Sequence, residues 1–242
     1  MQFQHLATAP ECLGLAGVMV YKSRYADEEN VRWAGRLFRH YCIEGNTELL
    51  SRRYGYEYAL KHIMNPDFDD GLEGWTIKAA RQGSVEARAV QGLGRMQGRV
   101  AAGVGNNALW TKRCENRPNM ITQEIKGLVP GQMYSVKAIA ADFGAWKVGK
   151  SDNEKIVTSV RVDGAEVDEK KSFSIANHGF VKLGAFIKTN GVPYHKYHWL
   201  VFRAKGASAL LTLSDWETDA QPGGPIGQEI VWNFVEVQPY FD

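Results

Sequence analysis

Long apolar runs and regularly spaced cysteines are both missing from this 242-residue sequence. The longest apolar run, Leu13 to Tyr21, is too short to span a bilayer, so no membrane segment is predicted. Residues 1–10 carry neither the basic nor the apolar region of an export signal. The three cysteines lie far apart and lack the spacing of zinc or redox sites: Cys12, Cys42 and Cys114. A cysteine-based metal site is therefore not expected.

The sequence also has little excess charge and none of the common catalytic motifs. Its 29 basic and 27 acidic side chains give a formal net charge of +2. Because proteins that neutralise many phosphates need a strongly basic surface, this balance argues against a nucleic-acid partner. A nucleophile elbow, an HExxH zinc motif, a P-loop and a GxGxxG in a βαβ setting are all absent. No reaction is indicated by motif.

The residues that are present are typical of a globular protein rich in β-structure. The hydrophobic fraction is 44%, with 25 glycines, 7 tryptophans and 10 tyrosines. A chain of this length can bury a substantial core, either as one large domain or as a medium domain with an extension.

The first quarter of the chain has helical periodicity. Within residues 26–64, apolar side chains recur every three or four residues, at Val31, Ala34, Leu37, Phe38 and Tyr41. Residues 45 and 46 interrupt the pattern, and TELLSRRYGYEYALKHIM then predicts a second helix that ends before residue 66, a proline. Upstream, LAGVMVY is typical of a buried parallel strand. We therefore expect an α-helical extension over residues 1–64.

After Asn65 the pattern changes to short strands separated by turns. The predicted strands are ITQEIKGL, YSVKAIAAD, TSVRVDG, FVKLGAFI, WLVFRA, ALLTLSDW and IVWNFVEV, and the turn LVPGQ follows the first of them. Many short strands at regular spacing with glycine-rich turns predict a sandwich or jelly roll. The fold class is mainly β, with the helical extension at the N-terminus.

Four of these segments resemble a known group of proteins. NPDFDDGLEGW, ITQEIKGLVPGQMYSVKAIAAD, WLVFRAKGASALLTLSD and IVWNFVEV are similar, in that order, to jelly-roll carbohydrate-binding modules with a galactose-binding-like fold, the group that includes families 4, 9, 16 and 22. The resemblance covers residues 65–242. It implies a β-sandwich that binds a polysaccharide or oligosaccharide without catalysis.

The resemblance also implies a structural calcium between the opening turn and the last strand. The acid that follows the phenylalanine in the family falls on Asp69, and the first aspartate of the closing motif falls on Asn233. An amide oxygen still binds calcium, but the lost charge should weaken the site. The alternative is an ordinary turn rich in aspartate, without an ion.

Residues 14–45 resemble a different neighbour. GLAGVMVYKSRYADEENVRWAGRLFRHYCIEG is similar to the last strand and helix of a glycoside hydrolase (β/α) barrel. A complete barrel needs about 250 residues, so residues 1–64 are interpreted as a barrel remnant or as an adaptor that packs on the sandwich. The resemblance implies a covalently attached or docked glycoside hydrolase domain, and with it an extracellular or periplasmic location.

Sugar rings stack on exposed aromatic side chains, so tryptophans on polar segments are the first candidates for the binding site. Trp216 continues the more polar face of ALLTLSDW, Trp110 lies among polar residues in NNALWTKRC, and Trp146 lies in a stretch read as a loop, FGAWKVGKSDN. We expect these three rings to be exposed. The resemblance implies that Trp75 is a core ring, and the alternation of Trp232 with Ile230 and Phe234 predicts that it is a core residue as well.

VPYHKYHWLVFRAK holds the densest aromatic and histidine cluster. On a strand, one face carries His195, Tyr197, Trp199, Val201 and Arg203, while Tyr194, Lys196, His198, Leu200 and Phe202 form the other. The first face is the predicted sugar-binding face, with Tyr197 and Trp199 as the expected contacts and Arg203 suited to a polyhydroxylated or acidic sugar. The second face becomes apolar and is predicted to point into the core. Metal binding by the two histidines is disfavoured because side chains three apart diverge on a strand.

Two other classes of function stay open. In a polysaccharide lyase, His195 and Tyr197 would serve as base and acid and Arg203 would neutralise a uronic acid, whereas a glycosidase would use Asp215 and Glu217 as paired carboxylates. A protein interaction module is the third class, and a contiguous exposed apolar patch would favour it. The sequence favours non-catalytic sugar binding.

Overall fold

The computed structural model describes residues 28–53, 61–91, 93, 105–148, 156–178 and 194–240. The chain divides into two compact units, Met1–Tyr58 with Phe241–Asp242, and Ala59–Tyr240. The predicted strands LAGVMVY and FVKLGAFI lie outside the described residues. In the part of the chain that is described, no helix has both the length and the hydropathy to cross a membrane.

The first unit contains a helix where the sequence predicts one. Helix α2 spans Glu28–Phe38 and continues as a single turn of π-helix, η2, over Arg39–Ile43. A short helix, α3, spans Leu50–Arg53. The prediction that the second helix extends to residue 64 is wrong, because residues 61–64 are not helical. They belong to the second unit, where Ile63 is buried in the core of the sandwich.

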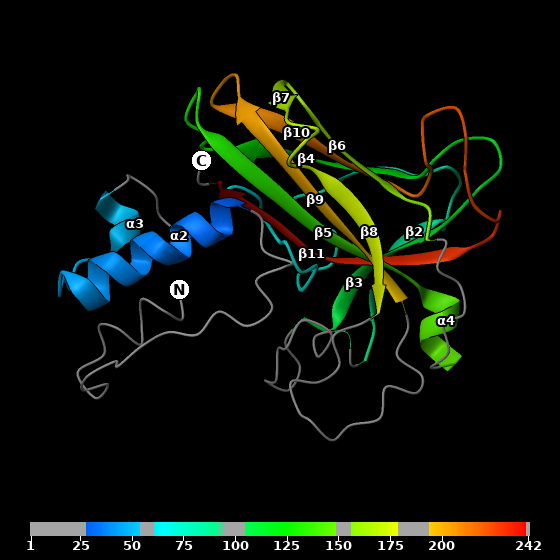
Figure 1. Cartoon of the computed structure of the whole chain (residues 1–242). Helices are drawn as coiled ribbons and strands as arrows, with labels where there is room; N and C mark the ends of the chain where they lie inside the picture. The colour runs from blue at the N-terminus through cyan, green and yellow to red at the C-terminus, as the bar shows by residue number, and fades with distance from the viewer. Residues whose placement is uncertain are drawn as a thin grey trace. The chain divides into compact units, whose positions relative to one another are not determined.

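The second unit is a sandwich of two antiparallel sheets, which confirms the mainly β prediction (Figure 1). The four-stranded sheet has the order β1 (Thr76–Lys78), β4 (Met120–Lys126), β10 (Ser208–Ser214) and β6 (Ser159–Asp163). The seven-stranded sheet has the order β2 (Val85–Ala89), β3 (Asn107–Lys112), β11 (Glu229–Pro239), β5 (Met133–Asp142), β9 (Tyr194–Ala204) and β7 (Ala165–Val167), with β8 (Phe173–His178) also paired to β9.

The main core lies between the two sheets. Strands β11 and β9 contribute Trp232 and Phe202, and β10 contributes Leu211 and Leu213; all four are fully buried. Trp75 is also buried, which confirms the prediction that both it and Trp232 are core residues.

The opposite side of the seven-stranded sheet, which we call the outer face, is only partly covered. Alternate residues of β3, β5 and β11 form a second apolar cluster there: Ala108, Trp110, Ile139, Ala141 and Val231. The short helix α4 (Phe143–Val148) adds Phe143 and Trp146 to this cluster. The side chains of β8 and the neighbouring half of β9 lie beyond the cluster, and they include the candidate site.

Candidate functional site

Three aromatic rings lie side by side on the outer face at β8 and β9. The ring centroids of Phe173 and Tyr197 are 5.9 Å apart, those of Tyr197 and Trp199 are 6.3 Å apart, and those of Phe173 and Trp199 are 6.5 Å apart. Their planes are within 19° of one another. Phe173 is 45% exposed, and the other two rings are partly exposed. We call these three residues the aromatic strip.

Strand alternation places the strip on this face. In β9, Leu200 and Phe202 point into the main core, so Tyr197 and Trp199 point outward, as the sequence predicts. Phe173 on β8 lies directly opposite Trp199 in the strand pairing. Sequence reasoning missed Phe173, although the period of two in SFSI, with Ile175 as its second apolar residue, is a signal for a strand.

A charged pair borders the strip on the side away from β8. Lys137 of β5 is paired with Trp199 of β9 and, on its other side, with Glu236 of β11. The Lys137 Nζ lies 2.9 Å from the Glu236 Oε2, and both side chains are largely buried. Burial, with a further contribution from the Glu236 carboxylate, raises the pKa of Tyr197 to about 12. The strip therefore has an apolar part and, beside it, one cation and one anion.

Trp216 is buried, so the prediction that its ring is exposed is wrong. It is 4% exposed, and its Nε1 donates a hydrogen bond to the Cys114 carbonyl oxygen at 3.1 Å. Strand β10 ends at Ser214, so the alternation used for the prediction does not continue to residue 216.

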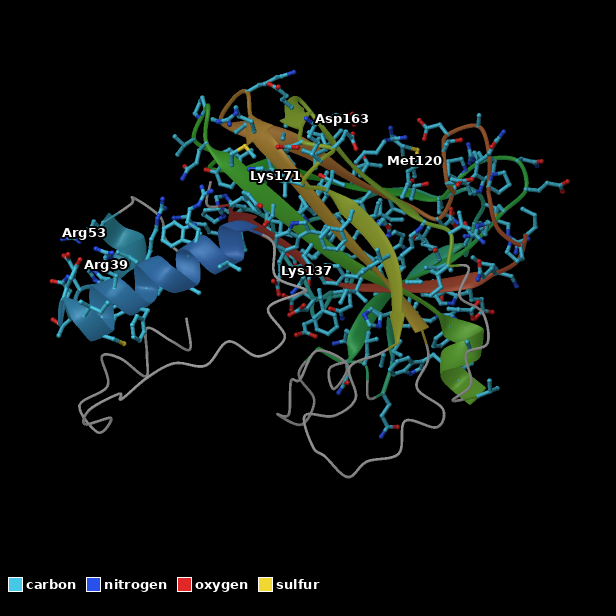
Figure 2. The ribbon with its side chains drawn as sticks, in the orientation of Figure 1. Arg39, Arg53, Met120, Lys137, Asp163 and Lys171 are labelled. Carbon is cyan, nitrogen blue, oxygen red and sulfur yellow. The ribbon has the colours of Figure 1, made fainter. Side chains whose placement is uncertain are left out.

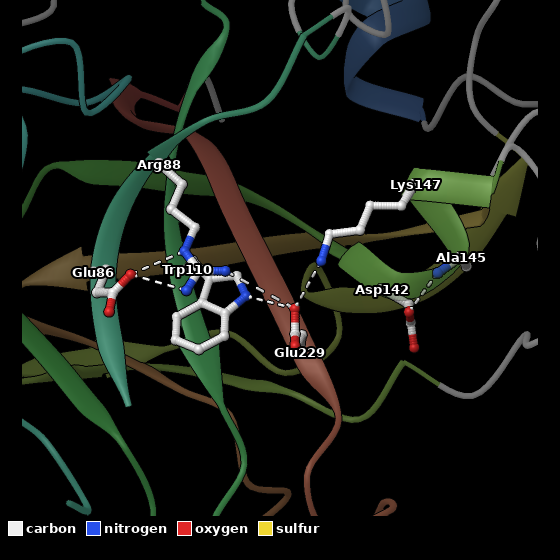
Figure 3. A network of polar contacts seen from close by, with 7 residues as sticks. All are labelled: Glu86, Arg88, Trp110, Asp142, Ala145, Lys147 and Glu229. Atoms are coloured by element: carbon white, nitrogen blue, oxygen red, sulfur yellow. Dashed lines mark hydrogen bonds and ion pairs between the residues drawn. The ribbon is translucent and has the colours of Figure 1, made fainter. Parts of the chain in front are cut away.

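Trp110 is likewise buried, at 3% exposure, so its predicted exposure is also wrong. The guanidinium carbon of Arg88 lies 3.5 Å from the centre of its ring, and its Nε1 donates to Glu229 Oε2 at 3.1 Å. Figure 3 shows this arrangement, in which Glu86 binds Arg88 at 2.9 Å and Lys147 reaches Glu229 at 3.4 Å. The indole is therefore covered by a network of two cationic and two anionic side chains.

Trp146 lies on helix α4, whereas the sequence predicts a loop. Asp142 begins the helix, since its Oδ1 accepts a hydrogen bond from the Ala145 backbone N–H at 2.8 Å (Figure 3). The indole is partly buried against the second apolar cluster. It packs on the same face as the strip but is not one of its rings.

The residues of the lyase alternative are poorly suited to acid and base roles. His195 is buried, and this burial lowers its pKa to about 4, which makes it a weak base. The raised pKa of Tyr197 likewise makes its hydroxyl a weak acid. The Arg203 Nη1 donates to the Gly131 carbonyl oxygen at 2.6 Å.

The glycosidase alternative is contradicted by the position of Asp215. Asp215 is fully buried and lies beyond the end of β10, so it does not share a strand face with Glu217, which is exposed. Its carboxylate accepts hydrogen bonds from the Asn119 backbone N–H at 2.9 Å and from Asn119 Nδ2 at 2.6 Å. A carboxylate buried in this way cannot reach a glycosidic bond.

The opening turn and the closing strand meet at the predicted calcium position. Asn233 Nδ2 donates to the Asp67 carbonyl oxygen at 3.3 Å and to the Asn107 carbonyl oxygen. Asn107 Nδ2 donates to Asp69 Oδ1 at 2.9 Å, and Asn233 Oδ1 accepts from the Phe234 N–H. The oxygens gathered here are of the type that calcium prefers. However, two of these oxygens, the carbonyls of Asp67 and Asn107, accept hydrogen bonds from the Asn233 side-chain nitrogen.

No cluster of three or more histidine, cysteine, aspartate or glutamate side chains that could hold a metal occurs among the described residues. His195 and His198 face opposite sides of the sheet, since His198 stacks on the core residue Trp232 and His195 lies beside the outward-facing Ala141.

No protein-family model and no curated protein matches the sequence. Among solved structures, a family 61 carbohydrate-binding module in complex with β-1,4-galactotriose is 11% identical, with 74% of this chain and 98% of that chain covered and a TM-score of 0.39. A family 4 carbohydrate-binding module is 13% identical, with 74% and 99% covered and a TM-score of 0.32. The enzymatically active domain of tailspike protein 4 from bacteriophage CBA120 is 11% identical, and the match covers 75% of this chain and 22% of that chain with a TM-score of 0.44.

Structural neighbours of the chain thus include carbohydrate-binding modules. TM-scores of 0.32 to 0.44 are too low to carry a functional conclusion from those proteins to this one.

Proposed function

We propose that the sandwich binds a polysaccharide or oligosaccharide without catalysis, through the aromatic strip. The observation that carries this proposal is the set of three near-parallel rings of Phe173, Tyr197 and Trp199 at the surface of the sheet. Exposed rings are costly to leave in water, and the apolar face of a pyranose covers them without needing charge. Neither alternative for catalysis has an accessible acid together with an accessible base, because His195 and Asp215 are buried.

The charged pair beside the strip supplies the polar contacts that such a ligand needs. Sugar hydroxyl groups both donate and accept hydrogen bonds, and Lys137 is a donor while Glu236 is an acceptor. Because the two side chains lie next to Trp199, hydroxyl groups at the rim of a stacked sugar fall within their reach. The aromatic strip would then contribute most of the affinity, and the pair would orient the sugar.

We expect Trp199→Ala and Phe173→Ala each to weaken binding to the preferred glycan by about twofold to twelvefold, since a stacked ring contributes roughly 0.5–1.5 kcal/mol. Affinity electrophoresis in gels containing the polysaccharide measures this. Leu210→Ala is the matched control, because Leu210 is an exposed apolar side chain on the four-stranded sheet. Equal retardation of wild type and both strip variants would exclude the strip as the binding site.

A protein interaction module is the second candidate, and one observation favours it. Ile175 is 45% exposed and lies on β8 next to Phe173, so the strip continues as an apolar patch. The variant Ile175→Ser distinguishes glycan binding from protein binding. Ile175→Ser should leave glycan binding unchanged if the rings carry it, and would abolish association with a protein partner if the apolar patch does.

We also propose that the chain is accessory to a glycoside hydrolase. The support is the resemblance of residues 14–45 to the end of a hydrolase barrel. An immunoblot of the native source with antibodies raised against the sandwich tests this. A polypeptide that carries or co-purifies with hydrolase activity on the retained glycan is the expected result. Detection of a polypeptide of this chain's size that neither carries nor co-purifies with hydrolase activity would argue against the association.

A structural calcium at Asp69 and Asn233 is a further part of the proposal. Calcium would bind if the Asn233 amide turned over, so that Oδ1 in place of Nδ2 faced the carbonyl oxygens of Asp67 and Asn107. Excess calcium should then raise the midpoint of thermal unfolding by several degrees relative to EDTA, because a ligand at about 100 times its Kd contributes about 2.7 kcal/mol. Asp69→Ala should remove this rise. An identical midpoint in calcium and EDTA would show that the turn needs no ion.

A further inference from the structure

The aromatic strip is closed at one end by Tyr240. The Tyr240 backbone N–H donates to the Met133 carbonyl oxygen at 2.9 Å, which places its backbone two strands away from β9, opposite Arg203. Its ring nevertheless lies 6.5 Å from the ring of Trp199, at 61° to it. The side chain therefore leans from β11 across β5 towards the strip.

The residues between Tyr240 and Trp199 support this arrangement. Val201 and Ser135 are paired across β9 and β5 and point to the outer face, yet Val201 is fully buried and Ser135 almost so. Both are small side chains, and in the strand register they lie between the positions of Tyr240 and Trp199. Lys171 lies over that ring, with its Nζ 5.2 Å from the ring centre. The strip thus ends at the Tyr240 ring, which meets Trp199 edge-on and has the Lys171 ammonium group over its face.

Two other sides of the strip are also bounded. At the opposite end, Tyr197 packs against the second apolar cluster, on which α4 lies with Phe143 and Trp146. On the β5 side lies the pair formed by Lys137 and Glu236. Figure 2 labels Lys137, which lies on β5, and Lys171, which lies in the turn between β7 and β8. The remaining side faces β8, where Phe173 and Ile175 are exposed. Among the described residues, no further side chain contacts the strip on that side.

We propose that the strip binds the end of a glycan chain rather than an internal stretch, an inference that rests on the proposed function. A chain bound along its length must leave the site on two sides. Along β9, Tyr240 and the cluster under α4 bound the strip in both directions, and across the sheet the aromatic surface ends at the charged pair of Lys137 and Glu236. A terminal sugar enters from the β8 side and stacks on rings that together offer room for one or two pyranose rings. Tyr240 is then a specificity-determining residue.

Partial acid hydrolysis of a retained polysaccharide tests this proposal. The probes are galactan, mannan, xylan and a β-glucan, each before and after hydrolysis to about one tenth of its mean chain length, compared at equal sugar mass in competition against the gel-bound polymer. Recognition of chain ends predicts that hydrolysed material competes about tenfold better, because it carries about ten times as many ends. Competition that is unchanged or weaker after hydrolysis would overturn end recognition while leaving glycan binding established.

A variant provides the second arm of the test. Tyr240→Ala opens the closed end and should increase binding of the uncut polymer severalfold, whereas Tyr240→Phe keeps the ring and should behave as wild type. Loss of binding in Tyr240→Ala to both uncut and hydrolysed glycan would contradict the role as a barrier and make Tyr240 a contact. If neither wild type nor variant binds any of the probes or their hydrolysates, the proposed function itself fails, and end recognition fails with it.

Discussion

Asp215→Ala is expected to lower the free energy of unfolding by about 3–5 kcal/mol, the usual consequence of removing one member of a buried charged group. Arg113 is also buried. Of the two carboxylates that stabilise its positive charge, Asp215 and Asp142, Asp215 has the larger effect. The substitution leaves that guanidinium with less compensating charge. It also leaves the backbone N–H and the side-chain amide of Asn119 without the carboxylate that both now bond.

Burial affects the two charges in opposite directions. It lowers the pKa of Arg113, and it raises the pKa of Asp215 in spite of the hydrogen bonds from Asn119. Arg113 is held in place by the carbonyl oxygens of Asp215, Val157 and Pro225. Arg113, Asp215 and Asn119 therefore hold the loop after β10 against the rest of the sandwich, so the role of Asp215 is structural.

Chemical denaturation of Asp215→Ala and Glu217→Ala, the two members of the glycosidase alternative, distinguishes structure from catalysis. Glu217 is exposed, so its removal should change stability by no more than about 0.5 kcal/mol. Neither variant should alter the release of reducing ends from any polysaccharide. A stable Asp215→Ala variant that had lost a hydrolytic activity present in wild type would reinstate the carboxylate pair.

Acidification from pH 6.5 to pH 4 is the second large effect, and it is expected to destabilise the fold by several kcal/mol. His198 is buried between two hydroxyl groups, Thr158 Oγ1 at 2.8 Å from Nε2 and Ser174 Oγ at 2.9 Å from Nδ1. Burial, together with the nearby Lys196, lowers the pKa of His198 to about 3. Burial alone lowers that of His195 to about 4.

The direction follows from proton binding. An unfolded histidine titrates near pH 6.5, so below that pH the unfolded chain binds protons that the folded chain does not, and stability falls as pH falls. At about 1.36 kcal/mol for each unit of pKa difference, His198 accounts for a loss of about 3 kcal/mol by pH 4, and His195 adds a loss of similar size. The raised pKa of Asp215 acts in the opposite direction at the acid end of this range.

The measurement is the free energy of unfolding in urea at several pH values, for wild type and His198→Asn. The variant should be less stable at pH 7, because asparagine cannot bond both hydroxyl groups in the same geometry. Between pH 6.5 and pH 4, however, the variant should lose about 3 kcal/mol less stability than wild type loses. Parallel curves for the two proteins would show that His198 is not the group that titrates.

The part of the site that lies within one strand could be predicted from the sequence. Side-chain alternation in β9 assigned Tyr197 and Trp199 to the outer face and Phe202 to the core, because a strand paired on both sides keeps a strict period of two. Alternation failed for Trp216, which lies beyond the end of its strand, and for Trp110, because both faces of β3 are covered.

The rest of the site depends on contacts between segments distant in sequence. Lys137 and Glu236 meet Trp199 only through the register of three strands, and Tyr240 reaches the strip across the strand positions of Ser135 and Val201. Register is determined by the packing of the whole sheet, so no local pattern signals these contacts. The position of Phe173 opposite Trp199 has the same origin.

Affinity electrophoresis of the purified chain against a panel of neutral and acidic polysaccharides, with reducing ends and unsaturated products assayed in the same mixtures, tests the central claim most directly. Retardation by at least one polysaccharide, lost in the Phe173→Ala, Trp199→Ala double variant and unaccompanied by new ends, is the result that non-catalytic binding through the aromatic strip predicts. Release of products, or retardation that the double variant retains in full, would contradict it.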